Sequence, residues 1–190
     1  MRIVGGIWRG IAIETPKGAD RTRPTTDRTR EAIASMLLSA RGLDLSGARV
    51  LDAFAGSGAL GLELLSRGAE SAVFIEKHRP TSALIRRNIA SCNGAGDRAE
   101  IICGDALRLA RTGFSGGPFD IVLLDPPYAF SAEYVAELIE LLAESGLLAE
   151  DAIVMYERAS DAPELASGAL SPLRSKRYGG TSVDLLVRKA

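Results

Sequence analysis

The sequence predicts a single α/β domain built on a doubly wound, mostly parallel sheet. The chain has 190 residues, of which 46% are hydrophobic, and this suits one domain whose sheet is covered on both faces. From Arg49 onward, short runs of β-branched and aliphatic residues alternate with longer amphipathic segments. Parallel strands need crossover connections and helices serve as those crossovers, so this alternation indicates a doubly wound sheet.

The first 40 residues are expected to form a small extension ahead of the main domain. Residues 2–13 contain two short apolar runs around glycines, a pattern typical of a hairpin. Residues 15–26 are interrupted by two prolines and a glycine and predict a loop. A helix is expected from Thr26 or Asp27, either of which can cap it, to about Ala40.

The remainder, residues 41–190, is expected to be the main domain. Its last two strands are joined by a stretch at 160–180 that is rich in proline, glycine and serine, so the final strand is predicted to be antiparallel. The expected strands are 49–55, 71–76, 99–105, 120–125, 152–158 and 182–189, and the expected helices are 59–68, 80–92, 106–111 and 132–146.

Positive charge is concentrated at the start of the chain. Residues 1–30 carry seven basic and three acidic side chains, a net charge of +4, whereas the whole chain has a net charge of -1. Such an arm suits a polyanion, with help from Arg174, Lys176 and Arg177, and the alternative is a solvated charged surface. In the same region, Trp8 either anchors the hairpin to the core or stacks on a base.

The composition argues against several classes of protein. Cys92 and Cys103 lack CxxC spacing and the chain has one histidine, so neither a disulfide framework nor a zinc site is indicated, and no metal is expected. No apolar stretch approaches the roughly 20 residues needed to span a bilayer, and the first ten residues lack the apolar core of a signal peptide. We expect a cytoplasmic monomer without a membrane partner.

A glycine-rich turn follows the first strand of the alternating region. Gly56, Gly58 and Gly61 stand in GxGxxG spacing, which allows a tight turn and the close approach of a ligand to the backbone. Glu76 ends the next strand, where a carboxylate can accept both hydroxyl hydrogens of a ribose. The turn and the acid together predict a cofactor that contains a nucleoside.

Two further acids bear on the identity of that cofactor. Dinucleotides and S-adenosylmethionine both use this architecture. Asp52 places negative charge near the end of the first strand, which is unfavourable beside a pyrophosphate and acceptable near the ammonium and sulfonium of S-adenosylmethionine. Asp105 could bond an adenine amino group or cap the helix that starts at Ala106, and both roles can hold together.

The sequence DPPY at residues 125–128 follows the buried strand 121–124. If this strand and the first one are neighbours, the acid opens into the same crevice as the glycine turn. The two prolines remove two N–H donors, so carbonyls here can point at a ligand, and the tyrosine adds an aromatic face. Such a group can hold a planar exocyclic amine, as on guanine, adenine or cytosine, and orient its nitrogen toward a methyl donor. The base must first leave its stack. The predicted catalytic residues are Asp125, Pro126, Pro127 and Tyr128.

With these motifs, essentially the whole chain resembles the bacterial 16S rRNA guanine-N2 methyltransferases. The glycine turn and DPPY are shared by many amino-methylating enzymes, whereas RPTTDRTRE and the short length are more specific to the family. The resemblance implies a seven-stranded sheet of the class I methyltransferase type. It also implies methyl transfer from S-adenosylmethionine, with S-adenosylhomocysteine as product, to the N2 amine of a guanine in 16S rRNA. The shared segments are MRIVGG, RPTTDRTREAIASML, LDAFAGSGALGLELLSRGA, VFIEKHRP, RRNI, DIVLLDPPYA and RYGGT.

The resemblance also implies site residues, carried over by position. The RPT segment at 23–25 would lie against cofactor and RNA. The modest net charge favours rRNA within a small-subunit assembly particle as the substrate. The implied cofactor-binding residues are Asp52, Gly56, Ser57, Gly58, Glu76, Asp105 and Ala106. The predicted RNA-binding residues combine the RPT segment with the basic arm, and are Arg9, Arg21, Arg23, Thr25, Arg28 and Arg30.

Other functions stay open on the residues alone. A DNA methyltransferase acting on adenine N6 or cytosine N4 could use DPPY, although 190 residues leave little room for a target-recognition region. An enzyme that methylates a protein glutamine is also possible, because an amide nitrogen poses the same chemical problem as an exocyclic amine. The basic arm and the aspartate, rather than asparagine, at the start of DPPY favour RNA as the substrate. An NAD-dependent dehydrogenase is disfavoured, because the DPPY residues would have no role in hydride transfer. An RNA-binding module would have no use for both Glu76 and Asp125.

Overall fold

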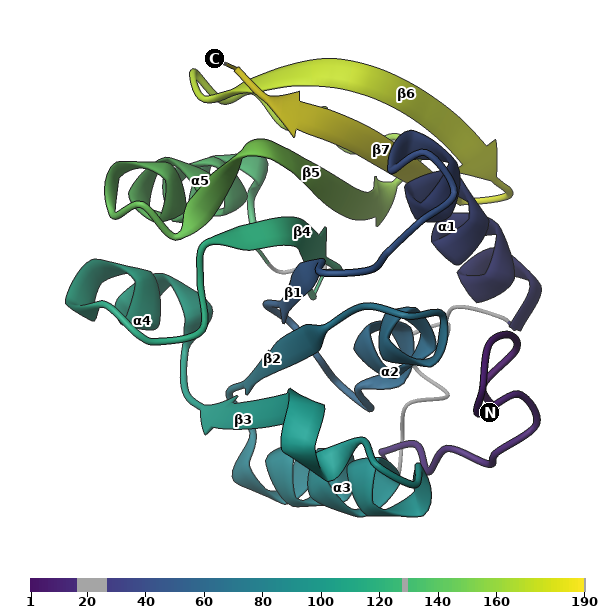
Figure 1. The fold of residues 1–190 in the computed structure, drawn as a ribbon. Coiled ribbons are helices and arrows are strands. Elements are labelled where there is room, and N and C mark those ends of the chain that lie inside the picture. Colours follow the sequence, from purple (N-terminus) through teal and green to yellow (C-terminus); the bar gives the residue numbers. More distant parts are fainter. Residues whose placement is uncertain (17–26, 128–129, 190) are drawn as a thin grey trace.

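A seven-stranded sheet with helices on both faces forms the centre of the molecule (Figure 1). The structure, a computed structural model, describes residues 1–16, 27–127 and 130–189. The strands are β1 (Arg49–Asp52), β2 (Ser71–Glu76), β3 (Ala99–Cys103), β4 (Phe119–Leu124), β5 (Leu148–Ala159), β6 (Leu170–Tyr178) and β7 (Thr181–Arg188). The helices are α1 (Asp27–Ala40), α2 (Ala59–Ser66), α3 (Arg79–Ser91), α4 (Ala106–Thr112) and α5 (Ala132–Glu144), with a short 3-10 helix η2 (Gly96–Arg98).

The sheet is parallel except at β7. Its order is β3-β2-β1-β4-β5-β7-β6, and β7 is antiparallel to both β5 and β6. The order reverses between β1 and β4, since the chain builds outward from β1 to one edge and then from β4 to the other. Ligands of such sheets bind at this switch point, beyond the carboxyl ends of the strands. The predicted doubly wound fold with an antiparallel last strand is confirmed.

Alternate residues of the central strands pack into two separate cores. Along β1, Val50 joins the core under α1, α2 and α3, whereas Leu51 joins the core under α4 and α5. Both residues are fully buried. Successive side chains of a strand point to opposite faces, so burial on both faces requires consecutive apolar residues, as at 50–51 in β1 and 121–124 in β4.

One strand lies where the sequence predicted irregular structure. β6 occupies residues 170–178, and β5 begins at Leu148 instead of the predicted 152. β6 is the last strand in the sheet order, six of its nine residues are exposed, and its pairing shifts between Pro172 and Arg174. An exposed edge strand that contains a proline lacks the apolar alternation by which strands are recognised, so the prediction for this stretch was wrong.

The first 13 residues form a hairpin-shaped arm, as the sequence predicted, but without regular strands. The arm has a single antiparallel bridge, between Arg2 and Ala12. On α2, the fully buried carboxylate of Glu63 accepts hydrogen bonds from the backbone N–H groups of Val4 and Gly5 at 2.7 and 2.8 Å. Because these donors are already satisfied by α2, the arm follows that helix and does not form a regular ladder.

Trp8 anchors this arm to the core, which was one of its two predicted roles. The residue is 4% exposed, and its indole N–H donates to the Asn93 carbonyl at 3.0 Å. The guanidinium carbon of Arg98 lies 5.1 Å from the ring centroid. The backbone N–H of Trp8 donates to the Ser66 hydroxyl at 2.9 Å. A ring covered in this way is not available to stack on a base.

The composition-based expectations concern membranes, metals and thiols. Within the described ranges, no helix is long and apolar enough to cross a membrane. The same ranges contain no group of three or more His, Cys, Asp and Glu side chains placed to hold a metal ion. Cys92 is buried, Cys103 is exposed, and both are free thiols.

Candidate active site

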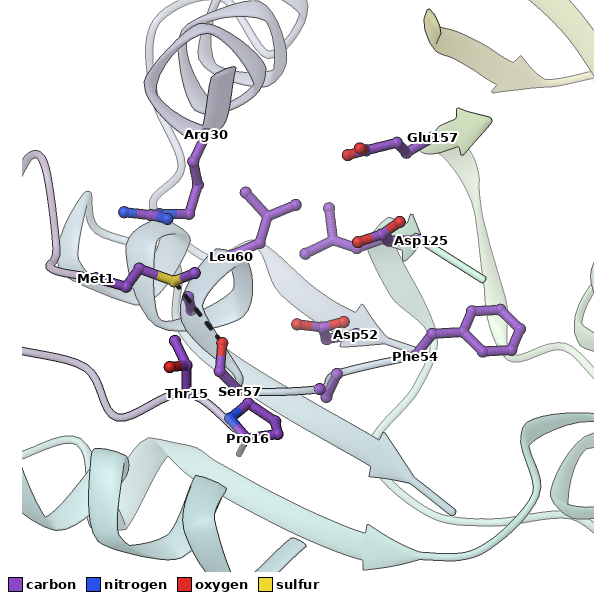
Figure 2. A pocket seen from close by; sticks show the side chains of 14 residues that line it. Met1, Thr15, Pro16, Arg30, Asp52, Phe54, Ser57, Leu60, Asp125 and Glu157 are labelled. Carbon is purple, nitrogen blue, oxygen red and sulfur yellow. Dashed lines mark hydrogen bonds between the residues drawn. The ribbon is translucent and has the colours of Figure 1, made fainter. Parts of the chain in front are cut away.

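A pocket opens at the switch point between β1 and β4 (Figure 2). Residues from distant parts of the sequence form its wall, including the start of the chain, the glycine turn after β1 and the ends of β4 and β5. Figure 2 shows the carboxyl groups of three acids around the same space. The lining residues are Met1, Thr15, Pro16, Arg30, Asp52, Phe54, Ala55, Gly56, Ser57, Ala59, Leu60, Leu123, Asp125 and Glu157.

The glycine turn places backbone groups at the pocket because its residues adopt conformations that other residues disfavour. Gly56 has φ 53° and Gly58 has φ 74°, both in the left-handed region. Gly61, in the first turn of α2, is needed for a different reason. A Cβ there would lie 2.4 Å from the Phe74 ring and 3.2 Å from Asp52 Oδ2. The third glycine therefore lets α2 pack closely on β2.

Glu76 lies at the end of β2 and holds the glycine turn. Its Oε2 accepts a hydrogen bond from the Gly56 N–H at 3.0 Å, and its Oε1 accepts one from the His78 N–H at 2.7 Å. An ionised carboxylate has about four acceptor sites, so two bonds leave capacity for further donors. The predicted pairing of the turn with this acid is present in the structure, and it leaves Glu76 able to accept from a ribose.

Asp52 is the most deeply buried acid of the pocket. It is 5% exposed, and its Oδ2 accepts from the Gly61 N–H at 3.3 Å. Burial, opposed by the Gly61 hydrogen bond and aided by the negative charges of Asp125 and Glu76, raises the pKa of Asp52 to about 7. A buried carboxylate without a counter-ion is costly, so this position favours a cationic ligand group.

Asp125 follows directly after β4 and faces the same pocket. Its side chain is open to the pocket, yet the protein packed around it removes enough water to raise the pKa of Asp125 to about 6. The Pro127 carbonyl accepts from the Phe130 N–H at 2.9 Å, whereas no described residue donates to the Pro126 carbonyl. Tyr128, the fourth predicted catalytic residue, lies outside the described residues.

Asp105 caps α4, which is one of the two roles predicted for it. Its Oδ1 accepts from the Arg108 N–H and from the Tyr134 hydroxyl, and its Oδ2 accepts from Lys77 Nζ, each at 3.1 Å. Burial acts to raise the pKa of Asp105, but these hydrogen bonds outweigh it and lower the pKa. Ala106, the first residue of α4, is buried beside it. The adenine-binding role of Asp105 stays a prediction.

The residues predicted to bind RNA have different surroundings. Arg9 and Arg28 are exposed, whereas Arg30 is 2% exposed and lines the pocket. The Nη2 atom of Arg30 donates to the Arg2 carbonyl and to Asp27 Oδ1, and its Nε and Nη1 have no partner in the described part of the chain. An outer-surface contact with RNA does not fit this burial. The other predicted residues, Arg21, Arg23 and Thr25, lie outside the described residues.

Sequence reasoning missed two features of the site. Glu157, near the end of β5, brings a third acid to the pocket. Phe54 of the pocket lies 5.9 Å from the Phe130 ring, which stacks on Tyr134 at 4.4 Å, so an aromatic row leads from the pocket to Asp105. The aromatic residues near DPPY in the sequence were a usable signal. No motif marks Glu157, which reaches the pocket only through strand order.

The strand order and the position of the pocket define the class of fold, the Rossmann-like fold of class I methyltransferases. A solved structure with this fold is magnesium protoporphyrin IX methyltransferase (ChlM) from Synechocystis PCC 6803. It has a TM-score of 0.67 and 19% identity, and the match covers 99% of this chain and 88% of that chain. At this identity the likeness concerns the fold alone.

Closer relatives identify the family. The family model "Conserved hypothetical protein 95" matches residues 1–187, and the chain belongs to this family. "Ribosomal RNA small subunit methyltransferase D" of Escherichia coli (strain K12) is 40% identical over 157 residues, which are 83% of this chain and 74% of that protein. A solved structure described as "Putative methyltransferase yhhF from Escherichia coli" has a TM-score of 0.82 and 34% identity, covering 100% of this chain and 98% of that chain. This is a family of rRNA small-subunit methyltransferases.

Proposed function

We propose that the protein transfers a methyl group from S-adenosylmethionine to the exocyclic N2 amine of a guanine in 16S rRNA. Family membership makes the chain an rRNA methyltransferase that depends on S-adenosylmethionine. The choice of an aromatic amine as acceptor rests on one observation. Asp125, after β4, opens into the pocket that Asp52 and the glycine turn also line.

The described residues fit S-adenosylmethionine. Asp52 is a buried acid whose ionisation is unfavourable without a cation, and the ammonium and sulfonium of the cofactor supply positive charge. Glu76 has remaining acceptor sites for ribose hydroxyls. Gly56 and Ser57 line the pocket, where the backbone can be approached closely. We propose these residues, with Gly58, Asp105 and Ala106, as the cofactor site.

Asp125 and the Pro126 carbonyl are proposed to accept the two N–H groups of the target amine. The nitrogen lone pair of such an amine is delocalised into the ring, and hydrogen bonds from its N–H groups favour localisation of that pair. When bound, S-adenosylmethionine supplies the electrophilic methyl group. As the N–C bond forms and the C–S bond breaks, the amine becomes cationic, and its proton passes to Asp125 or to water. Positioning of the amine is the main contribution of this chain.

Two acids at the pocket support guanine as the base. The Watson–Crick edge of guanine presents two adjacent donors, N1–H and the N2 amine, whereas adenine presents an acceptor at N1. Asp125 and Glu157 both line the pocket, so a base edge with neighbouring donors suits it. An rRNA base reaches such a pocket only when unpaired or flipped.

The proposal also covers whether the substrate is bare or assembled rRNA, and the oligomeric state and domain organisation of the protein. With a net charge of -1, the protein has little overall attraction for bare RNA, which favours an assembling small subunit as substrate. We propose a cytoplasmic monomer in which residues 1–40 extend a methyltransferase domain at 41–190.

The experiment that tests the function is methyl transfer from labelled S-adenosylmethionine to four acceptors in parallel. The acceptors are unmodified small subunits, protein-free 16S rRNA transcript, DNA and total protein, and nucleoside analysis identifies the product. N2-methylguanosine in the ribosomal samples is expected. Label in DNA or in protein glutamine would overturn rRNA as the acceptor. A methylated nucleoside other than N2-methylguanosine would overturn the N2 amine of guanine as the target atom. Equal rates on transcript and subunits would overturn the assembled-particle substrate.

A further inference from the structure

We propose that the outer part of β6, through Arg174 and Lys176, is a docking surface for the RNA backbone that flanks the target nucleotide. This inference rests on the proposed function in one respect, because it takes RNA as the substrate. It does not depend on which base or which atom is methylated.

The first argument is the charge of β6. The strand carries three basic side chains, Arg174, Lys176 and Arg177, and no acidic one. All three residues are exposed, and none forms an ion pair with a described residue. Arg158 of β5, by comparison, is paired with Asp184 at 2.7 Å. The positive charge of β6 is therefore available to an external anion.

The register of the sheet places two of these side chains on one face. Arg174 pairs with Leu185 and Lys176 pairs with Val183, and paired residues of neighbouring strands point to the same face. Leu185 and Val183 belong to the core under α1, so Arg174 and Lys176 stand on the α1 side of the sheet. Two residues of a strand span about 7 Å. Arg177 points to the opposite face, where its Nε donates to a backbone carbonyl at 2.9 Å.

The same register places this basic face close to the pocket. Val183 pairs with Lys176 on one side and with Glu157 on the other. Lys176 is thus two strands away from a pocket-lining acid, or about 10 Å at the usual spacing of strands. α1 lies beside the turn between β6 and β7, where the Tyr178 hydroxyl contacts Met36 Sδ at 3.4 Å (Figure 1). RNA whose base enters the pocket then passes over α1 to β6.

The basic face is also held in place. Lys176 Nζ lies 5.2 Å from the centroid of the Tyr178 ring, and Tyr178 is fixed against α1 through Met36. A side chain that is already positioned loses less conformational freedom when it binds a phosphate. Phosphate contacts of this kind set the position of a nucleic acid and carry no sequence information. The occupant of this surface is therefore the sugar-phosphate backbone of the substrate RNA.

The test compares two double variants that remove equal charge from opposite edges of the sheet. Arg174→Gln with Lys176→Gln removes the basic face of β6. Arg86→Gln with Arg108→Gln is the matched control, because these residues are exposed on α3 and α4, toward the β3 edge. The readouts are KM and kcat for unmodified small subunits, affinity for 16S rRNA transcript from 50 to 200 mM salt, and affinity for S-adenosylmethionine.

The β6 variant is expected to raise KM about tenfold, with kcat and cofactor affinity unchanged. Its slope of log affinity against log salt should be less steep by about 2, since each lost phosphate contact removes about 1. The control should match the wild type. Equal effects of the two variants, or no effect of either, would overturn the docking surface. If the wild type transfers no methyl group to RNA, the proposed function fails, and the salt slopes still decide whether β6 binds RNA.

Discussion

The side-chain amide of Asn88 donates a hydrogen bond to the Ser57 carbonyl at 2.8 Å, so α3 fixes the middle of the glycine turn. The same side chain also holds the residue that follows the N-terminal arm. Asn88 Nδ2 donates to the Glu14 carbonyl at 3.0 Å, and Asn88 Oδ1 accepts from the Glu14 N–H at 2.9 Å. One buried side chain therefore connects the turn that lines the pocket to the segment that precedes α1.

Replacing Asn88 with Ala should weaken both connections. Loss of buried hydrogen bonds costs about 1–3 kcal/mol, because the remaining partners are left unsatisfied. We expect a lower Tm and roughly tenfold weaker binding of S-adenosylmethionine, measured by thermal unfolding and calorimetry. Asn93→Ala is the control, since the Asn93 side chain is exposed. Unchanged cofactor affinity in Asn88→Ala would show that the glycine turn keeps its shape without the amide.

Replacing Glu63 with Ala should strongly destabilise the fold. The Glu63 carboxylate is fully buried, accepts from two backbone N–H groups of the arm and pairs with Arg67 at 2.7 Å. Removing one partner of a buried ion pair costs about 3–5 kcal/mol. The exposed Glu70, which lies 3.9 Å from Arg49, provides a control whose removal should cost less than about 1 kcal/mol. Denaturant unfolding measures both, and similar losses would contradict the role of Glu63.

Replacing Gly61 with Ala should destabilise the protein although alanine favours helices. The added Cβ would lie 2.4 Å from the Phe74 ring, which is fully buried. Overpacking of this kind typically costs about 1–3 kcal/mol. It should also weaken cofactor binding, because Asp52 lies at the same contact. Gly96→Ala is the control, since its Cβ would meet no atom within 4 Å. A stability gain at Gly61 would mean that α2 shifts freely.

The stability of the unliganded protein should fall as pH rises from about 5 to about 7. The pKa of Asp52 is raised to about 7, so in this range the folded state holds a proton that the unfolded state has released. The cost grows from about pH 4 and is fully present above about pH 7, where a pKa raised by about 3 corresponds to about 4 kcal/mol. Asp52→Asn should flatten this dependence of Tm on pH, and an unchanged slope would assign it to other groups.

Binding of S-adenosylmethionine should have the opposite dependence on pH. A cation beside Asp52 favours the ionised carboxylate, so the cofactor should bind more tightly at pH 8 than at pH 5.5 and should release a proton near pH 6. Calorimetry in buffers of different ionisation enthalpy measures that proton. Binding heats that are independent of the buffer would mean that no acid of the pocket changes its protonation.

Replacing Asp125 with Ala should abolish turnover while leaving cofactor affinity within about twofold. The loss of the acceptor affects the amine and not the nucleoside-binding turn. In the wild type, kcat should rise as pH increases through about 6, because desolvation raises the pKa of Asp125 to about 6. Below that pH the carboxyl is protonated, so it accepts the amine N–H poorly and cannot take up the proton that the amine releases. Methyl transfer to unmodified small subunits measures the turnover of the variant and the pH dependence of kcat in the wild type, and calorimetry measures cofactor affinity. A large loss of cofactor binding would assign Asp125 to the cofactor site instead.

The sequence predicted those parts of the fold and site that depend on local pattern. Alternation of apolar runs and helical segments placed strands β1 to β5 and the helices that connect them. The rule that ligands lie at the switch point then brought Asp52 and Asp125 together, and the register confirms that β1 and β4 are neighbours. Spacing also paired the glycine turn with Glu76 correctly.

The parts that were missed depend on tertiary contacts. Arg30 belongs to a basic segment in the sequence, yet helix geometry turns it inward and buries it. Glu157 reaches the pocket because β5 packs beside β4, which no local pattern reveals. In the sheet β6 pairs only with β7, and six of its nine residues are exposed, so it lacks the continuous apolar face by which a strand is recognised in a sequence.

The position of β6 at the edge of the sheet also bears on how the protein behaves at high concentration. An edge strand presents unpaired backbone groups that can pair with another copy, and basic side chains and proline oppose such pairing. β6 has both, in Arg174, Lys176, Arg177 and Pro172. The charges on this strand are therefore expected to oppose its pairing with another copy, and variants that neutralise them should aggregate at lower protein concentration than variants of α3 or α4.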